Sequence, residues 1–214
     1  MSLARMLIVI VCLSYVSISW SDAHAEENAK AQLLELLAPY KQLSAQFQQV
    51  VVDRNGEQVQ QLEGSLHAAR PAKLYWETLA PDESVLVADG ETIWYYNPFV
   101  EQVSIYSQQE SLQQSPFLLL FDPTSPQWQN YSVEQDEGRY WIIGQDAAVG
   151  QRIAVQFNSQ QQLSAVVVDD GQGQVSTISL TDIDSNITHA DGFFQFTPPA
   201  GTFIDDQRGD RDAR

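Results

Sequence analysis

Cysteine is almost absent from the chain, and the one that occurs, Cys12, lies in an apolar run near the N-terminus. Arg5 precedes this run, which extends from Met6 to Val16, and the sequence Ala23-His24-Ala25 follows it. A positive residue, a short apolar segment and an A-x-A site are typical of a secretory signal peptide. We therefore expect residues 1–25 to be cleaved. The alternative is a retained anchor, but a membrane span needs ~20 apolar residues.

The mature chain, residues 26–214, would contain no cysteine. Disulfide scaffolds, thiol catalysis and thiolate metal sites are thereby excluded. An exported chain without disulfides must be stabilised by its hydrophobic core, and a chain of this length can bury one. Because it has no internal repeat or low-complexity linker, we expect residues 26–214 to form one domain.

Histidine is scarce as well. Only His67 and His189 remain after cleavage, and their spacing matches no metal-binding signature. A nucleophile elbow, a P-loop and a dinucleotide fingerprint are also missing. The number of acidic residues alone does not exclude a pair of catalytic carboxylates, although most acidic residues fall in expected turns, where they are solvated. We expect no catalytic residue, no metal site and no cofactor.

Basic residues are few, with 11 Lys and Arg against 28 Asp and Glu and a formal net charge of −17. This balance excludes a general nucleic-acid binder, which needs a basic surface. It also disfavours adsorption to anionic lipid. The charge either serves solubility alone or keeps a protein with apolar cargo away from membranes.

Aromatic and aliphatic residues are concentrated between Ser84 and Val103. Asp89-Gly90 separates two apolar runs there and predicts a β-hairpin, because glycine supplies the positive φ of a tight turn. Trp94, Tyr95 and Tyr96 place rings on both faces of the second strand, since side chains alternate along a strand. So much ring surface needs an apolar cover.

Alternating apolar residues and tight turns predict further short strands before and after this hairpin. The expected strands are 47–52, 58–68, 73–78, 102–107, 131–136, 139–144, 151–158, 163–168, 174–181 and 193–196, with Gly64 at a bulge or bend. Such a meander curls into a half or whole barrel.

Two segments have a helical pattern and could supply the cover. Residues 26–40 carry clustered leucines and end near Pro39. Residues 108–130 are too long for a hairpin loop, contain a leucine-rich run after Ser115-Pro116, and are expected to form one or two short helices.

Arg70 is unusual as one of few cations, placed before Pro71 at the start of a strand. A surface salt bridge is one interpretation, contributing at most ~1 kcal/mol. Alternatively, its five donors could hold the C-terminal carbonyls of a covering helix as a releasable latch.

Several motifs resemble those of the LolA family, the periplasmic outer-membrane lipoprotein carriers of Gram-negative bacteria, and the resemblance covers essentially the whole mature chain. They are Arg70-Pro71, Trp76, Pro81-Asp82-Glu83-Ser84, Val87-x-Asp89-Gly90, the block Trp94-x-Tyr96-Asn97-Pro98-Phe99-Val100-Glu101-Gln102, Phe196-Thr197-Pro198-Pro199 and Asp205-Asp206-Gln207-Arg208.

The resemblance implies a mainly β fold with an α lid. This would be an incomplete antiparallel β-barrel of about eleven strands, covered by an N-terminal helix and short loop helices. It implies a monomeric, non-enzymatic periplasmic chaperone. Such a carrier takes acylated outer-membrane lipoproteins from an inner-membrane lipoprotein-releasing ABC transporter, shields their acyl chains in an apolar cavity and passes them to an outer-membrane receptor.

Carried over position by position, Arg70 becomes the lid latch, with carbonyl acceptors expected near Leu37, Leu120 and Phe121. The residues expected to line the cavity or lid are Leu33, Leu37, Leu43, Phe47, Val51, Leu74, Trp76, Leu86, Phe117, Leu118 and Leu120. The chain departs from the family at Leu74, preceded by Lys73, where the family usually has an aromatic residue.

Two other functions remain open. A periplasmic sensor that binds lipids or lipoproteins would have the same half-barrel, although such proteins typically carry a further domain. A secreted hydrolase with an acid pair would need a polar cleft in place of the leucine-rich lid.

Overall fold

The computed structural model describes residues 20–114, 116–144 and 151–209, and most of residues 1–25, the expected signal peptide, lie outside them. Within these residues, two α-helices, two 3-10 helices (η) and twelve strands follow one another. They are α1 (Trp20–Leu37), β1 (Gln42–Val52), β2 (Gln58–Ala69), β3 (Lys73–Thr78), β4 (Ser84–Ala88), β5 (Thr92–Asn97), β6 (Gln102–Ser107), α2 (Gln108–Gln114), η1 (Pro116–Phe121), η2 (Pro126–Asn130), β7 (Tyr131–Asp136), β8 (Arg139–Gly144), β9 (Arg152–Phe157), β10 (Leu163–Asp169), β11 (Val175–Asp184) and β12 (Phe203–Asp206).

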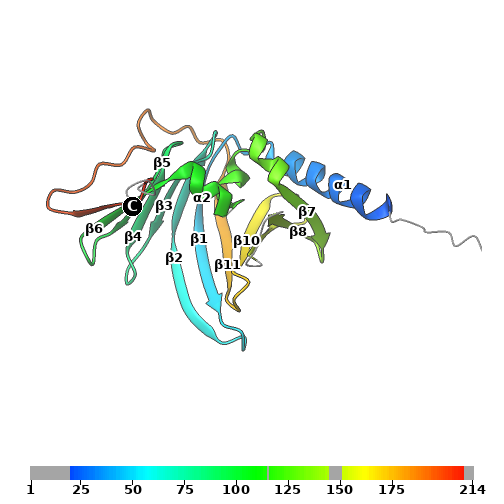
Figure 1. Ribbon diagram of the computed structural model, residues 1–214, viewed down its shortest axis with the longest axis horizontal. Coiled ribbons are helices and arrows are strands. Elements are labelled where there is room, and N and C mark those ends of the chain that lie inside the picture. Colours follow the sequence, from blue (N-terminus) through cyan, green and yellow to red (C-terminus); the bar gives the residue numbers. More distant parts are fainter. Residues whose placement is uncertain (1–19, 115, 145–150, 210–214) are drawn as a thin grey trace, which may run out of the picture.

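One sheet contains all twelve strands, in the order β12-β6-β5-β4-β3-β2-β1-β11-β10-β9-β8-β7. Neighbours are antiparallel except for β12, which pairs parallel to β6. Within the described residues β7 and β12 do not pair, so the strongly curved sheet stays open as a half-barrel (Figure 1). The predicted mainly β fold with an unclosed sheet and short helices is confirmed.

Most predicted strands are present; one is absent, one extends further than its predicted residues, and one observed strand was not predicted. β1 begins at Gln42, before the expected residue 47, because its pairing with β2 extends to Gln42 opposite Ala69. Residues 193–196 form turns closed by the N–H of Gln195 to the Gly192 carbonyl, 2.9 Å, and are not a strand. β12 was not anticipated as a strand.

The helical segments are also confirmed, with shifted limits. α1 ends at Leu37, before the expected Tyr40, because the residue preceding Pro39 is disfavoured in α conformation. Residues 108–130 form α2, η1 and η2. We call α1, α2 and η1 together the lid.

The lid packs against one face of the sheet, which we call the lid face. α1 packs mainly on β7, where the ammonium of Lys30 donates to the Tyr131 carbonyl at 2.7 Å, and η1 packs on β3. Partial burial lowers the pKa of Lys30. Figure 1 shows α1 beside β7 and β8, and α2 above the opposite half of the sheet.

Gly64 is needed where three strands meet. It pairs in register with Phe47 on β1 and Thr78 on β3, so it is not a bulge. A Cβ there would lie 1.9 Å from the Glu77 carbonyl oxygen and 2.8 Å from the Phe47 ring. Only glycine leaves room for that ring over the backbone.

The other face of the sheet, the outer face, has its own cover. Residues 185–202, here called the C-terminal segment, cross it between β11 and β12 (Figure 1). Phe196 packs on Trp94 and Tyr96 with centroid distances of 6.1 and 6.0 Å. Two of the three aromatic rings of β5 are thus covered on the outer face, and Tyr95 alone points to the lid face.

Candidate functional site

The lid face carries the main hydrophobic cluster, which includes side chains of both the sheet and the lid. Phe47 and Trp76, on β1 and β3, have ring centroids 4.1 Å apart. Phe117 of η1 packs edge-on against Trp76 at 5.9 Å and against Phe121 at 6.0 Å. These rings form a continuous apolar path from the sheet into the lid.

Leucines of the lid fill the rest of this interface. Leu33 and Leu37, one turn apart on α1, are 0% and 1% exposed. Leu119 and Leu120 of η1 are equally buried. Two helical segments far apart in sequence therefore bury their apolar faces on the same sheet surface, which at ~25 cal/mol per Å² favours the closed arrangement.

The predicted lining residues lie largely together. All of them belong to the main cluster or pack against it, except Val51, which is buried outside it. Leu74, at the position where the family usually has an aromatic residue, is 3% exposed within the cluster. Whether these residues contact cargo stays a prediction.

Arg70 lies in the turn between β2 and β3 and holds the end of α1. Its Nη2 donates to the carbonyl oxygens of Leu37 and Ala38, both at 2.9 Å. These carbonyls belong to the C-terminal end of the helix, where intrahelical donors are missing. Its Nε is buried and has no hydrogen-bond partner among the described residues.

The same turn also contacts the second half of the lid, but not through Arg70 as expected. The Phe121 carbonyl accepts from the N–H of Ala72 at 3.4 Å. Gln108, at the start of α2, is 2% exposed, donates to the Ala72 carbonyl at 2.8 Å and accepts from the N–H of Gly90 at 3.1 Å. Sequence reasoning missed Gln108, because a single glutamine at a strand end carries no motif.

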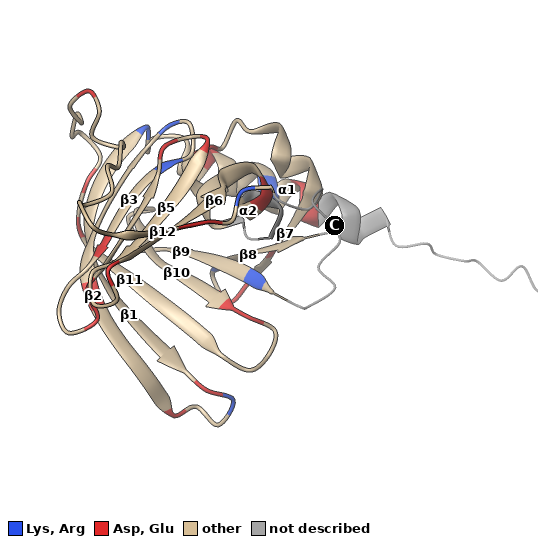
Figure 2. Cartoon of the chain, turned by 60° about the vertical axis from the view of Figure 1, so that its left-hand side comes forward, with Lys and Arg blue, Asp and Glu red and all other residues tan. Residues whose placement is uncertain are grey.

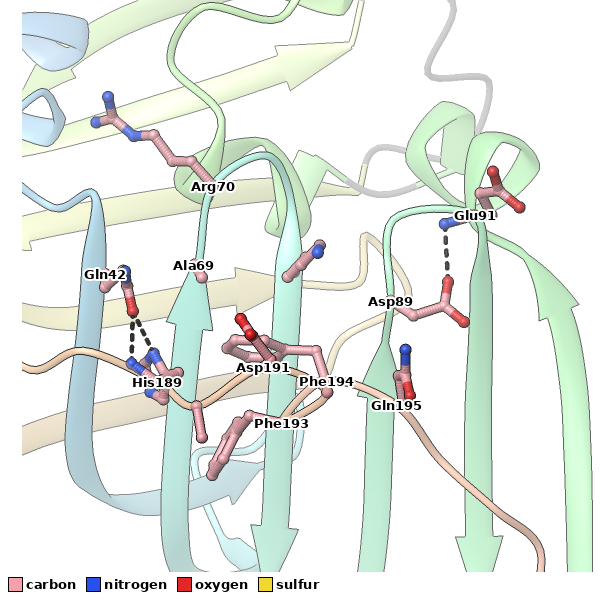
Figure 3. A pocket seen from close by; sticks show the side chains of 13 residues that line it. Gln42, Ala69, Arg70, Asp89, Glu91, His189, Asp191, Phe193, Phe194 and Gln195 are labelled. Atoms are coloured by element: carbon pink, nitrogen blue, oxygen red, sulfur yellow. Dashed lines mark hydrogen bonds between the residues drawn. The ribbon is translucent and has the colours of Figure 1, made fainter.

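A polar pocket of about 430 Å³ lies at the rim of the outer face, beside this turn (Figure 3). Strand ends and the C-terminal segment line it, including Gln42, Asp89, His189 and Asp191. Arg70 borders the pocket, but its side chain points away from the other labelled side chains. Charged groups in this pocket make it unsuited to acyl chains.

Asp89 organises the β4–β5 turn at this rim. Its carboxylate accepts from the N–H groups of Glu91 and Thr92 at 2.9 and 2.8 Å and from the Trp94 indole at 3.2 Å. Burial alone would raise the pKa of Asp89, but these hydrogen bonds outweigh it and the pKa is lowered. The predicted hairpin turn is therefore held by a charged carboxylate.

His67 and His189 contact each other on the outer face. Gln42 Oε1 accepts from the backbone N–H of His189 at 2.9 Å and faces its Nδ1 at 2.8 Å, so Nδ1 carries a proton. In the neutral ring Nε2 then accepts from His67 Nδ1 at 3.1 Å. Burial lowers the pKa of both rings, and the proximity of His67 lowers that of His189 further. This pair fastens the C-terminal segment to β1 and β2.

Within the described part of the chain, no group of three His, Cys, Asp or Glu side chains is arranged to hold a metal ion. The site therefore consists of two apolar surfaces, the lid and the lid face of the sheet, which a few hydrogen bonds hold together at the Arg70–Ala72 turn.

Comparison with known proteins decides the family. The model of the outer membrane lipoprotein carrier protein LolA matches residues 39–197. The chain is 42% identical to an outer-membrane lipoprotein carrier protein of Idiomarina loihiensis over 86% of this chain and 91% of that one. It is 36% identical to that of Vibrio parahaemolyticus, over 90% and 93%. The chain belongs to the LolA family.

A solved structure agrees on the fold. A conserved protein from Thermus thermophilus, with 13% sequence identity, superposes with a TM-score of 0.51 over 83% of this chain and 98% of its own. Membership of the LolA family makes this chain a lipoprotein carrier-type protein with an open half-barrel. None of the helices in the described residues is long and apolar enough to span a membrane.

Proposed function

We propose that this protein carries acylated lipoproteins through the periplasm as a monomer. It would take them from an inner-membrane lipoprotein-releasing ABC transporter and pass them to an outer-membrane receptor. The observation that carries the proposal is the closure of the lid: two leucine-rich segments pack on one apolar sheet face, and hydrogen bonds at the Arg70–Ala72 turn join them. The name of the relatives supports the cargo.

The energetics fit a carrier that must both hold and release. Each acyl methylene exposed to water costs about 0.8 kcal/mol, so a lipoprotein's acyl chains need a large apolar surface. Opening the lid would expose the lid face and the leucines of α1 and η1. Acyl chains can then replace the lid's side chains against Phe47, Trp76 and Leu86. The empty protein closes again because its own leucines cover the same surface.

Arg70 is proposed to set the free-energy difference between the closed and open states. Its hydrogen bonds at the end of α1 go to main-chain carbonyls, those of Leu37 and Ala38. Such bonds can break without leaving a buried charge, since the guanidinium can turn to water.

The decisive experiment adds purified mature protein and ATP to membranes that contain the transporter. Lipoprotein released into solution in complex with the protein, and transferred onward when receptor is added, is the expected result. Release that is equal without the protein, or a complex that never forms, would contradict the proposal. A fluorescent acyl probe separates the enzyme alternative, because a carrier binds the probe reversibly without converting it.

A further inference from the structure

A group of exposed apolar side chains lies at one end of the sheet. It consists of Phe99 and Val100, in the turn between β5 and β6, and Phe203 and Ile204, which begin β12. Their exposed fractions are 94%, 58%, 66% and 43%. We call these four residues the apolar tip. The two pairs are brought together because the N–H of Phe203 bonds to the carbonyl of Glu101, at 2.8 Å, in the β5–β6 turn. Phe203 and Ile204 follow one another on β12, so they project to opposite faces of its backbone.

The turn that presents Phe99 is held by specific hydrogen bonds. Asn97 Oδ1 accepts from the N–H of Phe99 at 3.0 Å and from the N–H of Val100 at 3.4 Å. The N–H of Glu101 closes the turn onto the Pro98 carbonyl, and Glu101 has a φ of 50°. This local network holds the backbone of the turn, and the side chains of Phe99 and Val100 that it carries are exposed to solvent.

In the described part of the chain β12 pairs only with β6, so it presents a free strand edge beside the tip. Phe203 and Gln207 direct their N–H groups to β6, at Glu101 and Ile105. In a parallel ladder alternate residues bond to the same side, so the backbone groups of Ile204 and Asp206 face away from the sheet. A partner could therefore bind this edge through main-chain hydrogen bonds as well as through apolar contact.

The surroundings of the tip are acidic. Asp206 is paired with Arg208 at 2.6 Å, whereas Glu101 and Asp205 form no ion pair within the described residues. Figure 2 shows acidic positions along β12. With a net charge of −17, the protein is repelled by anionic lipid and by a second copy of itself.

We infer that the apolar tip is the docking site for a partner protein with an apolar recess flanked by basic residues. This inference rests on the proposed carrier function, which requires the protein to meet membrane-anchored partners before cargo moves. A preorganised, protruding aromatic side chain is the usual energetic centre of a protein interface. The acidic rim would speed the encounter and select a basic partner.

The test measures binding of mature protein to the purified transporter and to the purified receptor by surface plasmon resonance. The variants are Phe99→Ser, Val100→Ser and Val59→Ser. Val59 is the matched control, since it is 55% exposed on β2, outside the tip. We expect Phe99→Ser to weaken binding to at least one partner by roughly tenfold or more, Val100→Ser to weaken it less, and Val59→Ser to leave it unchanged. Binding should also weaken as salt is raised.

Unchanged binding of Phe99→Ser to both partners overturns the inference, as does an equal loss with Val59→Ser. Wild-type binding to protein-free phosphatidylethanolamine–phosphatidylglycerol vesicles that Phe99→Ser abolishes would make a lipid surface the occupant and also overturn it. So would a wild-type dimer, in sedimentation equilibrium, that Phe99→Ser dissociates. Binding of an acyl probe keeps the two proposals separate. If the wild-type protein does not bind the probe, the carrier function fails. If all variants bind the probe equally, any loss of partner binding in Phe99→Ser comes from docking and not from cargo binding.

Discussion

Replacing Arg70 tests the lid most directly, because its contacts to α1 are few and defined. Arg70→Leu removes the two hydrogen bonds from Nη2 to the Leu37 and Ala38 carbonyls, both 2.9 Å long. α1 has no basic residue of its own in its last turn. The substitution therefore also removes a cation that interacts favourably with the helix C-terminus. Leucine keeps the apolar stem, so the change is confined to the guanidinium.

The magnitude follows from the two bonds. A hydrogen bond from a charged donor contributes about 1.5–3 kcal/mol, and the partly buried bond to Leu37 belongs at the lower end. The solvent-exposed bond to Ala38 adds roughly 0.5 kcal/mol. A total near 2 kcal/mol corresponds to a shift of about 30-fold toward the open lid, at 1.4 kcal/mol per tenfold. Arg70→Lys keeps the charge but not the planar fork, and should shift the equilibrium by less.

Hydrogen exchange by mass spectrometry, without cargo, measures this shift. Amides in residues 29–37 of Arg70→Leu should exchange up to about 30-fold faster, while those of β10 and β11 exchange as in wild type. If the open state binds cargo, as proposed, affinity for an acyl probe should rise by a similar factor and onward release should slow. Unchanged exchange of α1 and unchanged probe affinity in a folded variant would refute the latch.

Three further predictions concern stability. Gly64→Ala places a Cβ 1.9 Å from the Glu77 carbonyl oxygen, so β2 and β3 must separate. We expect the free energy of unfolding, measured by thermal unfolding, to fall by about 3 kcal/mol or more. A near-wild-type melting temperature would contradict this packing. Leu119 is 0% exposed, and Leu119→Ala should lower the free energy of unfolding, measured by urea denaturation, by about 2–5 kcal/mol. A loss below about 1 kcal/mol would show that the lid does not unfold together with the sheet. Because the pKa of both His67 and His189 is lowered from 6.5 in the folded protein, the unfolded chain binds more protons below that pH. The free energy of unfolding should therefore be largest above about pH 6.5 and should fall as the pH drops below it. His189→Gln should reduce this fall, and a variant with the wild-type pH profile would contradict the prediction.

Much of the fold follows from local sequence. Turns such as Asp89-Gly90 and the alternation of apolar residues indicate most strand limits, because both depend on residues close together in the chain. The leucines of α1 and η1 indicate a cover for the same reason. The resemblance to the LolA family supplied the open barrel and the importance of Arg70.

Residues 193–196 and β12 show where local reasoning fails. Phe193 and Phe194 are residue types typical of a strand, but here they lie in a turn. Their rings pack on the His189 ring, with centroid distances of 4.7 and 5.0 Å. β12 exists because β6 offers an unpaired edge to Phe203–Asp206. Both depend on strands distant in sequence.

The amino-acid sequence by itself determined an acidic, mainly β chain with two leucine-rich segments, and it predicted export. Only the tertiary structure decided which segment covers which face. It placed Trp94 and Tyr96 of the aromatic hairpin under Phe196 on the outer face and left Tyr95 partly exposed on the lid face. It also joined Gln108 and Ala72 to the same turn as Arg70. Burial on either face satisfies the same hydrophobic pattern, so the choice is made by sheet curvature and by hydrogen bonds between residues far apart in the chain.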